Sequence, residues 1–117
     1  MADTARFDTV VSNDYRVRFD EGRHPRAKIG YVLLATEQTV QDDAMRLRPE
    51  GVGVHFTRAA IPDLITNETL AAQAGLLADC AATLLPDGSL DVVCYACTSG
   101  SLVIGESQLC SVRFAAV

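Results

Sequence analysis

Apolar residues along this chain gather into three short runs, separated by segments in which apolar positions recur every three or four residues. The first run, residues 27–35, is continuously apolar, which is typical of a strand covered on both faces of a sheet. Residues 52–61 form a second run with more polar positions, and residues 90–98 form a third. We therefore predict three strands over these ranges.

The segments after the first and third runs have the features of helices. Residues 39–48 carry Thr39 and Asp42 in the spacing of a capping box, and arginines near their end. The segment 99–109 follows the third run and predicts the start of another helix.

The strongest helical pattern lies over residues 66–85. Thr66 or Asn67 is suited to cap the start of this helix, and Pro86 and Gly88 mark its end. Its apolar side chains fall on one stripe: Leu70, Ala74, Leu77, Ala81 and Leu84.

This alternation of strands and helices predicts an α/β fold. We expect a three-layer sandwich in which a short parallel sheet of order 2-1-3 is flanked by helices. Residues 1–26 read as an N-terminal arm, with a short edge strand at 15–19, and residues 27–117 as a single domain. Ligands bind at the carboxyl ends of such strands, so three segments matter most: 35–39, 55–58 and 96–101.

Composition and charge narrow the classes of partner. The chain has 117 residues and a net charge of -5, which argues against binding nucleic acid or an anionic membrane surface. No apolar run approaches the roughly 20 residues of a membrane span, and the N-terminus lacks the pattern of a secretory signal. We therefore expect a cytoplasmic protein whose four cysteines are reduced thiols.

Two of these cysteines, Cys94 and Cys97, stand three residues apart in the stretch DVVCYACTSGS. Zinc needs about four ligands, and neither a second such pair nor suitably spaced histidines are present, so we expect no metal. Three steps along a strand place the two side chains on opposite faces, which argues against a redox pair. Cys94 is then a small core residue, and Cys97 stands where the strand ends.

Two interpretations of Cys97 stay open. A tight turn at Gly100 into a helix would bring the N–H groups of residues 98–101 near the thiol, favour its thiolate and bind a carboxylate or oxyanion. Alternatively, Cys97 is a structural cysteine followed by a Ser/Thr helix cap. Since most cysteines are inert, the local pattern alone favours the structural interpretation.

Three further residues at the strand ends are candidates. Arg58 is suited to clamp a carboxylate, and His55 lies just before it on the same strand. Glu37 follows the first strand, where it either hydrogen-bonds a ligand or is a helix-start carboxylate favoured by the helix dipole. For His55 and Arg58, a partly buried histidine and a solvated arginine are the simpler alternatives.

The stretches KIGYVLLATEQT, VHFTR and DVVCYACTSGSLVIG resemble the N-terminal half of the maleate cis-trans isomerase and arylmalonate decarboxylase group, within the aspartate/glutamate racemase superfamily. The ectoine-utilisation branch is the most similar. The resemblance covers residues 27–105, and its most specific motif is C-T-S-G after a buried strand. It implies a cofactor-independent enzyme of two similar α/β halves that acts on a small carboxylate. Cys97 would be the nucleophile or acid/base, with Thr98 and Ser99 holding the carboxylate.

Two features depart from that family. Maleate isomerases carry an asparagine at the position of Glu37, and a carboxylate there would repel a dicarboxylate substrate. The family's chains are also roughly twice as long, consistent with two domain-sized halves. The second cysteine loop is missing, and Cys110 does not stand in a comparable loop. We therefore expect a fragment or truncated homologue, inactive alone unless a second copy completes the site, and a homodimer that covers its apolar faces.

Three functional classes remain after this comparison. The first is a racemase- or isomerase-type enzyme, or a related decarboxylase. The second is a non-catalytic binding or assembly module derived from the same fold. A flavodoxin-like nucleotide-binding domain is the weakest, because the loop after the first strand has no glycine-rich phosphate cradle.

Overall fold

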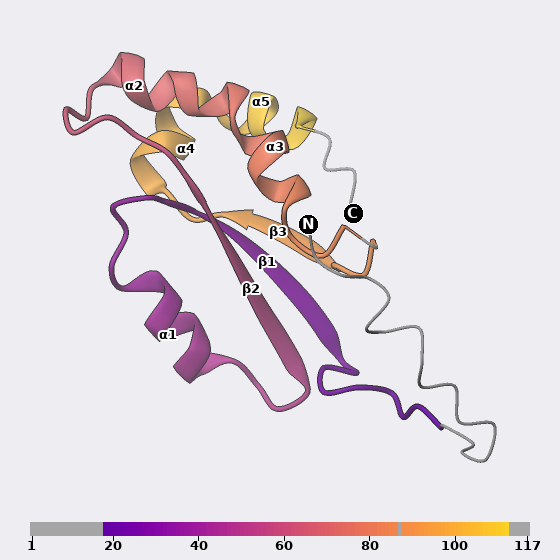
Figure 1. Ribbon diagram of the computed structural model, residues 1–117. Coiled ribbons are helices and arrows are strands. Elements are labelled where there is room, and N and C mark those ends of the chain that lie inside the picture. The colour runs from indigo at the N-terminus through magenta and orange to yellow at the C-terminus, as the bar shows by residue number, and fades with distance from the viewer. Residues whose placement is uncertain (1–17, 87, 113–117) are drawn as a thin grey trace, which may run out of the picture.

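A three-stranded parallel sheet lies at the centre of the computed structural model, which describes residues 18–86 and 88–112. Its strands are β1 (Ala27–Leu34), β2 (Val52–Ala59) and β3 (Val92–Tyr95). They are ordered β2-β1-β3, so β1 is central (Figure 1). The predicted fold class and strand order are therefore confirmed.

Strand register determines which side chains share a face of the sheet. Tyr31 of β1 pairs with Phe56 of β2 and with Cys94 of β3, so these three side chains lie on one face. Val32 pairs with Thr57 and Tyr95 on the opposite face. This alternation decides which residues reach the core.

The helices divide unequally between the two faces (Figure 1). Helix α1 (Val40–Leu47) lies on the face of Tyr31, and none of its residues is buried. The opposite face carries the other helices: α2 (Asn67–Ala72), α3 (Leu77–Ala82), α4 (Thr98–Ile104) and α5 (Glu106–Ser111). The main core therefore forms on that side, from Val32, Ala59, Leu77, Ala81 and Ile104.

Gly30 allows a second, smaller group of buried leucines to approach the sheet. A Cβ at this position would lie 2.9 Å from Leu84 Cδ1 and 3.0 Å from Leu90 Cδ1. Real Cβ contacts are longer, so a side chain at Gly30 would push these leucines away from β1.

The prediction of one continuous helix over residues 66–85 is wrong. It is divided into α2, the 3-10 helix η2 (Gln73–Gly75) and α3. Gln73 is almost fully buried, and its Nε2 donates to the Ala60 carbonyl oxygen at 2.5 Å, which ties this segment to the end of β2. The Leu76 N–H then bonds Gln73 O at 2.9 Å in the tighter 3-10 pattern.

The predicted start of this segment is confirmed, because Thr66 is the N-cap of α2. Its side chain accepts from the Thr69 N–H at 3.1 Å, and Thr69 Oγ1 accepts from the Thr66 N–H at 2.8 Å. The predicted last helix is also interrupted, since Gly105 adopts φ 89° between α4 and α5.

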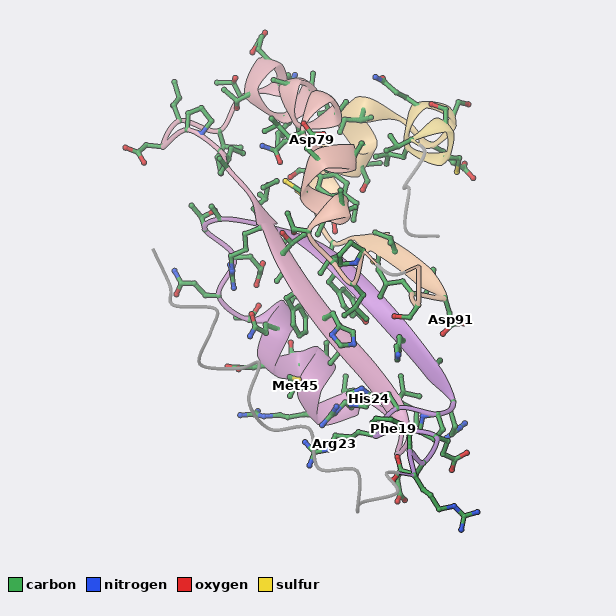
Figure 2. All side chains as sticks on the ribbon, turned by 45° about the vertical axis from the view of Figure 1, so that its right-hand side comes forward. Phe19, Arg23, His24, Met45, Asp79 and Asp91 are labelled. Carbon is green, nitrogen blue, oxygen red and sulfur yellow. The ribbon has the colours of Figure 1, made fainter. Side chains whose placement is uncertain are left out.

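Residues 18–26, before β1, form no helix or strand, and all of them except His24 are exposed. His24 lies beside β2 (Figure 2), and its ring is edge-on to that of His55, with centroids 5.8 Å apart. The edge strand predicted at 15–19 lies mostly outside the described residues. Among the helices of residues 18–86 and 88–112, none has the length and apolar character that crossing a membrane requires.

Candidate functional site

The loop after β1 and the junction of β3 with α4 meet at the carboxyl ends of the strands. They share a cavity of about 510 Å³ whose walls include Glu37 on one side and Cys97, Thr98 and Ser99 on the other. Two of the three segments predicted to matter are thus brought together at one place.

Cys97 is the N-cap of α4 and is 9% exposed. Its backbone is extended, and its Sγ accepts a hydrogen bond from the Gly100 N–H at 3.3 Å. The Ser99 hydroxyl lies 3.7 Å from the same sulfur. A thiol sulfur therefore takes the position that a serine or aspartate oxygen takes at most helix starts.

Gly100 fits tightly between Cys97 and Tyr95. A Cβ on Gly100 would lie 3.0 Å from Cys97 Sγ and 3.0 Å from Tyr95 Cζ, and would collide with the Tyr95 hydroxyl oxygen. The absence of a side chain at Gly100 therefore leaves room for the Tyr95 hydroxyl near the Cys97 thiol.

Tyr95 was not predicted as a site residue. Its hydroxyl is buried, and burial is the main cause that raises its pKa, followed by the neighbouring Cys97 thiol. The sequence did contain a signal, because the period-two alternation of a strand places Tyr95 and Cys97 on the same side.

Glu37 caps helix α1. Its Oε1 accepts from the Thr39 N–H at 2.5 Å, the Val40 N–H at 2.8 Å and the Thr39 hydroxyl at 2.9 Å. The backbone N–H of Thr39, followed by that of Val40, lowers the pKa of Glu37 to about 2. The capping box predicted from Thr39 and Asp42 is therefore wrong, since Thr39 makes no side-chain cap bond. Glu37 is a helix-start carboxylate, and contact with a ligand stays a prediction.

Arg58 holds the loop after β1 in place. Its Nη1 donates to the carbonyl oxygens of Leu34 at 3.1 Å and Glu37 at 2.7 Å, and its Nη2 lies 3.4 Å from Gln41 Oε1. The structure thus joins Arg58 to the same loop as Glu37. Its predicted role in clamping a substrate carboxylate stays a prediction.

His55 lies on the other face of β2 from Arg58, with Thr57. Burial is the main cause that lowers its pKa, and the nearby His24 and Lys28 add to the effect. Its partner in space is His24, so the structure does not bring His55 to Cys97.

An apolar cavity of about 740 Å³ adjoins the first one and shares Cys97 and Thr98 with it. Tyr95, Leu102 and Leu109 give it an apolar lining, and Cys110 lies at its wall. Cys97 therefore stands where a more polar and an apolar space meet. The pattern of the sequence gave no direct sign of Leu102 and Leu109 as lining residues.

The other cysteines differ from Cys97 in environment. Cys94 lies on the face of α1, half-buried, and burial raises its pKa. The pKa of Cys80 is also raised by burial, while Cys110 is exposed on α5. All four thiols are free. Cys94 pairs with Tyr31 on the face of α1, whereas Cys97 lies beyond the end of β3 and caps α4.

Comparison of this chain with protein-family models, with curated proteins and with solved structures gave no match. The assignment of a function therefore depends on the geometry around Cys97 and on the sequence motifs that form it.

Proposed function

We propose that this chain is a cofactor-independent enzyme of the racemase and isomerase type, acting on a small carboxylate through Cys97. The observation that carries the proposal is the placement of Cys97 Sγ. It lies at the carboxyl end of a parallel strand, bonded to the Gly100 N–H, in the wall shared by two cavities. The resemblance of the C-T-S-G motif to the aspartate/glutamate racemase superfamily supports the reaction class.

In this proposal the Cys97 thiolate removes a proton from the carbon next to the substrate carboxylate, or adds to a neighbouring double bond. Thr98 and Ser99 line the same cavity and are exposed at the start of α4, where their hydroxyl and N–H groups can hold the carboxylate. Holding that group also stabilises the negative charge that develops during proton removal.

The charge of Glu37 and the apolar lining of the adjoining cavity favour a substrate with a single carboxylate and an apolar substituent. Glu37 lines the cavity of Cys97, and its lowered pKa keeps it ionised at neutral pH. A second carboxylate on the substrate would be repelled by this charge. An apolar substituent, in contrast, fits the adjoining space beside Leu102 and Leu109.

One thiol exchanges a proton on one face of a carbon atom. Inversion of configuration needs an acid on the opposite face, and in this proposal a second copy of the chain supplies it in a homodimer. The proposal therefore separates two activities: proton exchange, which requires Cys97, and racemisation, which also requires assembly.

The test uses a panel of 2-substituted monocarboxylates in D₂O, with loss of the α-proton signal followed by NMR. Exchange is expected with the wild-type chain and with Cys94→Ser, which alters a thiol on the opposite face of the sheet that lines neither cavity, and is expected to fall roughly 100-fold or more in Cys97→Ser. Exchange that persists in Cys97→Ser, or that no member of the panel shows, would contradict the proposal.

A second candidate function, a non-catalytic binding or assembly module, is favoured by exposed apolar side chains. Leu47 of α1 is 81% exposed and Leu102 of α4 is 80% exposed, next to the Cys97 cavity. Light scattering and thermal unfolding with and without carboxylates separate the two candidates. Assembly without any response to carboxylates supports the module, and stabilisation by carboxylates that Cys97→Ser weakens supports the enzyme.

A further inference from the structure

We propose that Tyr95 is a positioning residue for Cys97, and that its hydroxyl donates a hydrogen bond to the Cys97 sulfur when the thiol is ionised. This inference deepens the proposed function and rests on it for its biological role. The contact itself can be tested without any substrate.

The fold places the Tyr95 ring beside the start of α4. Tyr95 is the last residue of β3, pairs with Val32 of β1, and packs against the main core. The tip of its ring faces Gly100 and Cys97, since the hydroxyl oxygen and Cys97 Sγ would both lie within 3.0 Å of a Cβ on Gly100.

The Tyr95 hydroxyl is a buried donor that lacks a well-aligned partner. Within residues 18–86 and 88–112, no side-chain or backbone group meets the geometric limits for a hydrogen bond to it. A buried hydroxyl without a partner is destabilising, so native proteins rarely keep one without a reason. Cys97 Sγ lies nearby, since it and the Tyr95 hydroxyl oxygen would both lie within 3.0 Å of a Cβ on Gly100, and its acceptor strength changes on ionisation.

Ionisation of Cys97 supplies the missing partner. A neutral thiol sulfur is a weak acceptor, whereas a thiolate accepts a charge-assisted hydrogen bond. The phenol stays protonated at neutral pH, because burial and then the neighbouring thiol raise the pKa of Tyr95. Tyr95 thus remains a donor throughout the range in which a thiol titrates.

When Cys97 is ionised, its sulfur has three neighbouring donors, two from α4 and one from β3. The Gly100 N–H lies 3.3 Å away and the Ser99 hydroxyl 3.7 Å away, both from α4, and the Tyr95 hydroxyl approaches from β3. Because the first two share a helix and the third comes from the sheet, the sulfur is fixed relative to both walls of the site. Gly100 is necessary for this arrangement, since a Cβ there would occupy the space of the hydroxyl.

The experiment measures the rate at which iodoacetamide alkylates Cys97 between pH 5 and 10, in a Cys110→Ser background, with mass spectrometry of the Cys97 peptide. Alkylation forms a sulfur–carbon bond and releases iodide, so its rate follows the thiolate fraction. Tyr95→Phe keeps the ring and removes only the hydroxyl. We expect it to raise the midpoint of the pH–rate profile by about one pH unit, a roughly tenfold loss of thiolate below both midpoints.

Tyr31→Phe is the matched control, because Tyr31 lies on the opposite face of the sheet, stacked on Phe56 at 5.3 Å. Its midpoint is expected to equal that of the parent chain. An unchanged or lowered midpoint in Tyr95→Phe, or an equal rise in Tyr31→Phe, would overturn the inference.

A second measurement keeps the inference testable if Tyr95→Phe unfolds the chain. With Tyr15 and Tyr31 replaced by Phe, Tyr95 is the sole tyrosine, and 3-fluorotyrosine incorporated there is a stronger donor of nearly the same size. A lowered midpoint is expected, and an unchanged one would overturn the inference.

A shifted midpoint without proton exchange on any carboxylate would refute the proposed function alone. Exchange with an unshifted midpoint would refute the role of Tyr95 alone.

Discussion

Gly100→Ala provides a direct probe of how tightly Cys97, Tyr95 and α4 fit together. The new methyl group would meet two atoms at 3.0 Å, Cys97 Sγ and Tyr95 Cζ, and would overlap the Tyr95 hydroxyl oxygen. Gly100 is buried, and its φ is not among the positive ones, so the backbone itself tolerates alanine. The whole effect should therefore come from the crowding of side chains.

The expected magnitude is the difference of two opposing effects. Overpacking a tight site costs about 1–3 kcal/mol, and three close atoms place Gly100→Ala in the upper part of that range. Replacing glycine by alanine in a helix recovers about 1 kcal/mol. We expect a net loss of about 1–2 kcal/mol in the free energy of unfolding, measured by urea denaturation.

Gly75→Ala is the control for this prediction. Gly75 lies in η2, and nothing stands within 4 Å of a Cβ built there. It should gain up to about 1 kcal/mol, since only the backbone effect remains. In the double variant Tyr95→Phe/Gly100→Ala, removal of the hydroxyl should recover about half of the loss. A Gly100→Ala variant as stable as Gly75→Ala, or no recovery on adding Tyr95→Phe, would contradict this prediction.

Three further predictions concern the residues that hold the site in place. Glu37→Gln should lower the free energy of unfolding relative to the wild type above pH 4.5. Because the folded-state pKa of Glu37 is lowered to about 2, this difference should disappear as the pH falls from about 4.5 to 2. Urea denaturation at each pH measures it. Arg58→Ala should lose about 1 kcal/mol of unfolding free energy, and hydrogen exchange at the N–H of Glu37 should quicken, whereas exchange in α3 should be unchanged. Gln73→Ala should lose about 2 kcal/mol of unfolding free energy, and Gln73→Met, which keeps the volume but not the bond to Ala60 O, about 1 kcal/mol; a Gln73→Met variant as stable as the wild type would show that the hydrogen bond contributes little.

Several features of the fold were predictable because single residues or short runs determine them. The apolar run that became β1 is covered on both faces, and Val32 and Leu33 are fully buried, so its central place followed from hydrophobicity alone. Thr66 caps α2 through contacts with the nearby Thr69, which a local pattern can reveal. Cys97 was placed at the carboxyl end of its strand for the same reason.

Features that depend on contacts between distant segments were not predictable. The helical stripe over residues 66–85 gave no sign that Gln73 would bond to Ala60 and divide the helix. Thr39 matched a capping pattern, yet Glu37 reaches the free N–H groups of α1 more closely. The approach of Tyr95 to Cys97 was predictable only in part: a period-two pattern places both on one side, but the turn into α4 that brings the hydroxyl to the thiol is not described by that pattern.

Affinity labelling tests most directly whether Cys97 stands beside a site that binds a carboxylate. The two reagents are 2-bromopropanoate and the uncharged 2-bromopropanamide, and mass spectrometry follows the labelling of Cys97 and of Cys110. We expect the carboxylate to label Cys97 with saturable kinetics and faster than the amide does, while the amide is faster at the exposed Cys110. A rate at Cys97 that rises linearly with 2-bromopropanoate, and stays below that of the amide, would contradict this expectation.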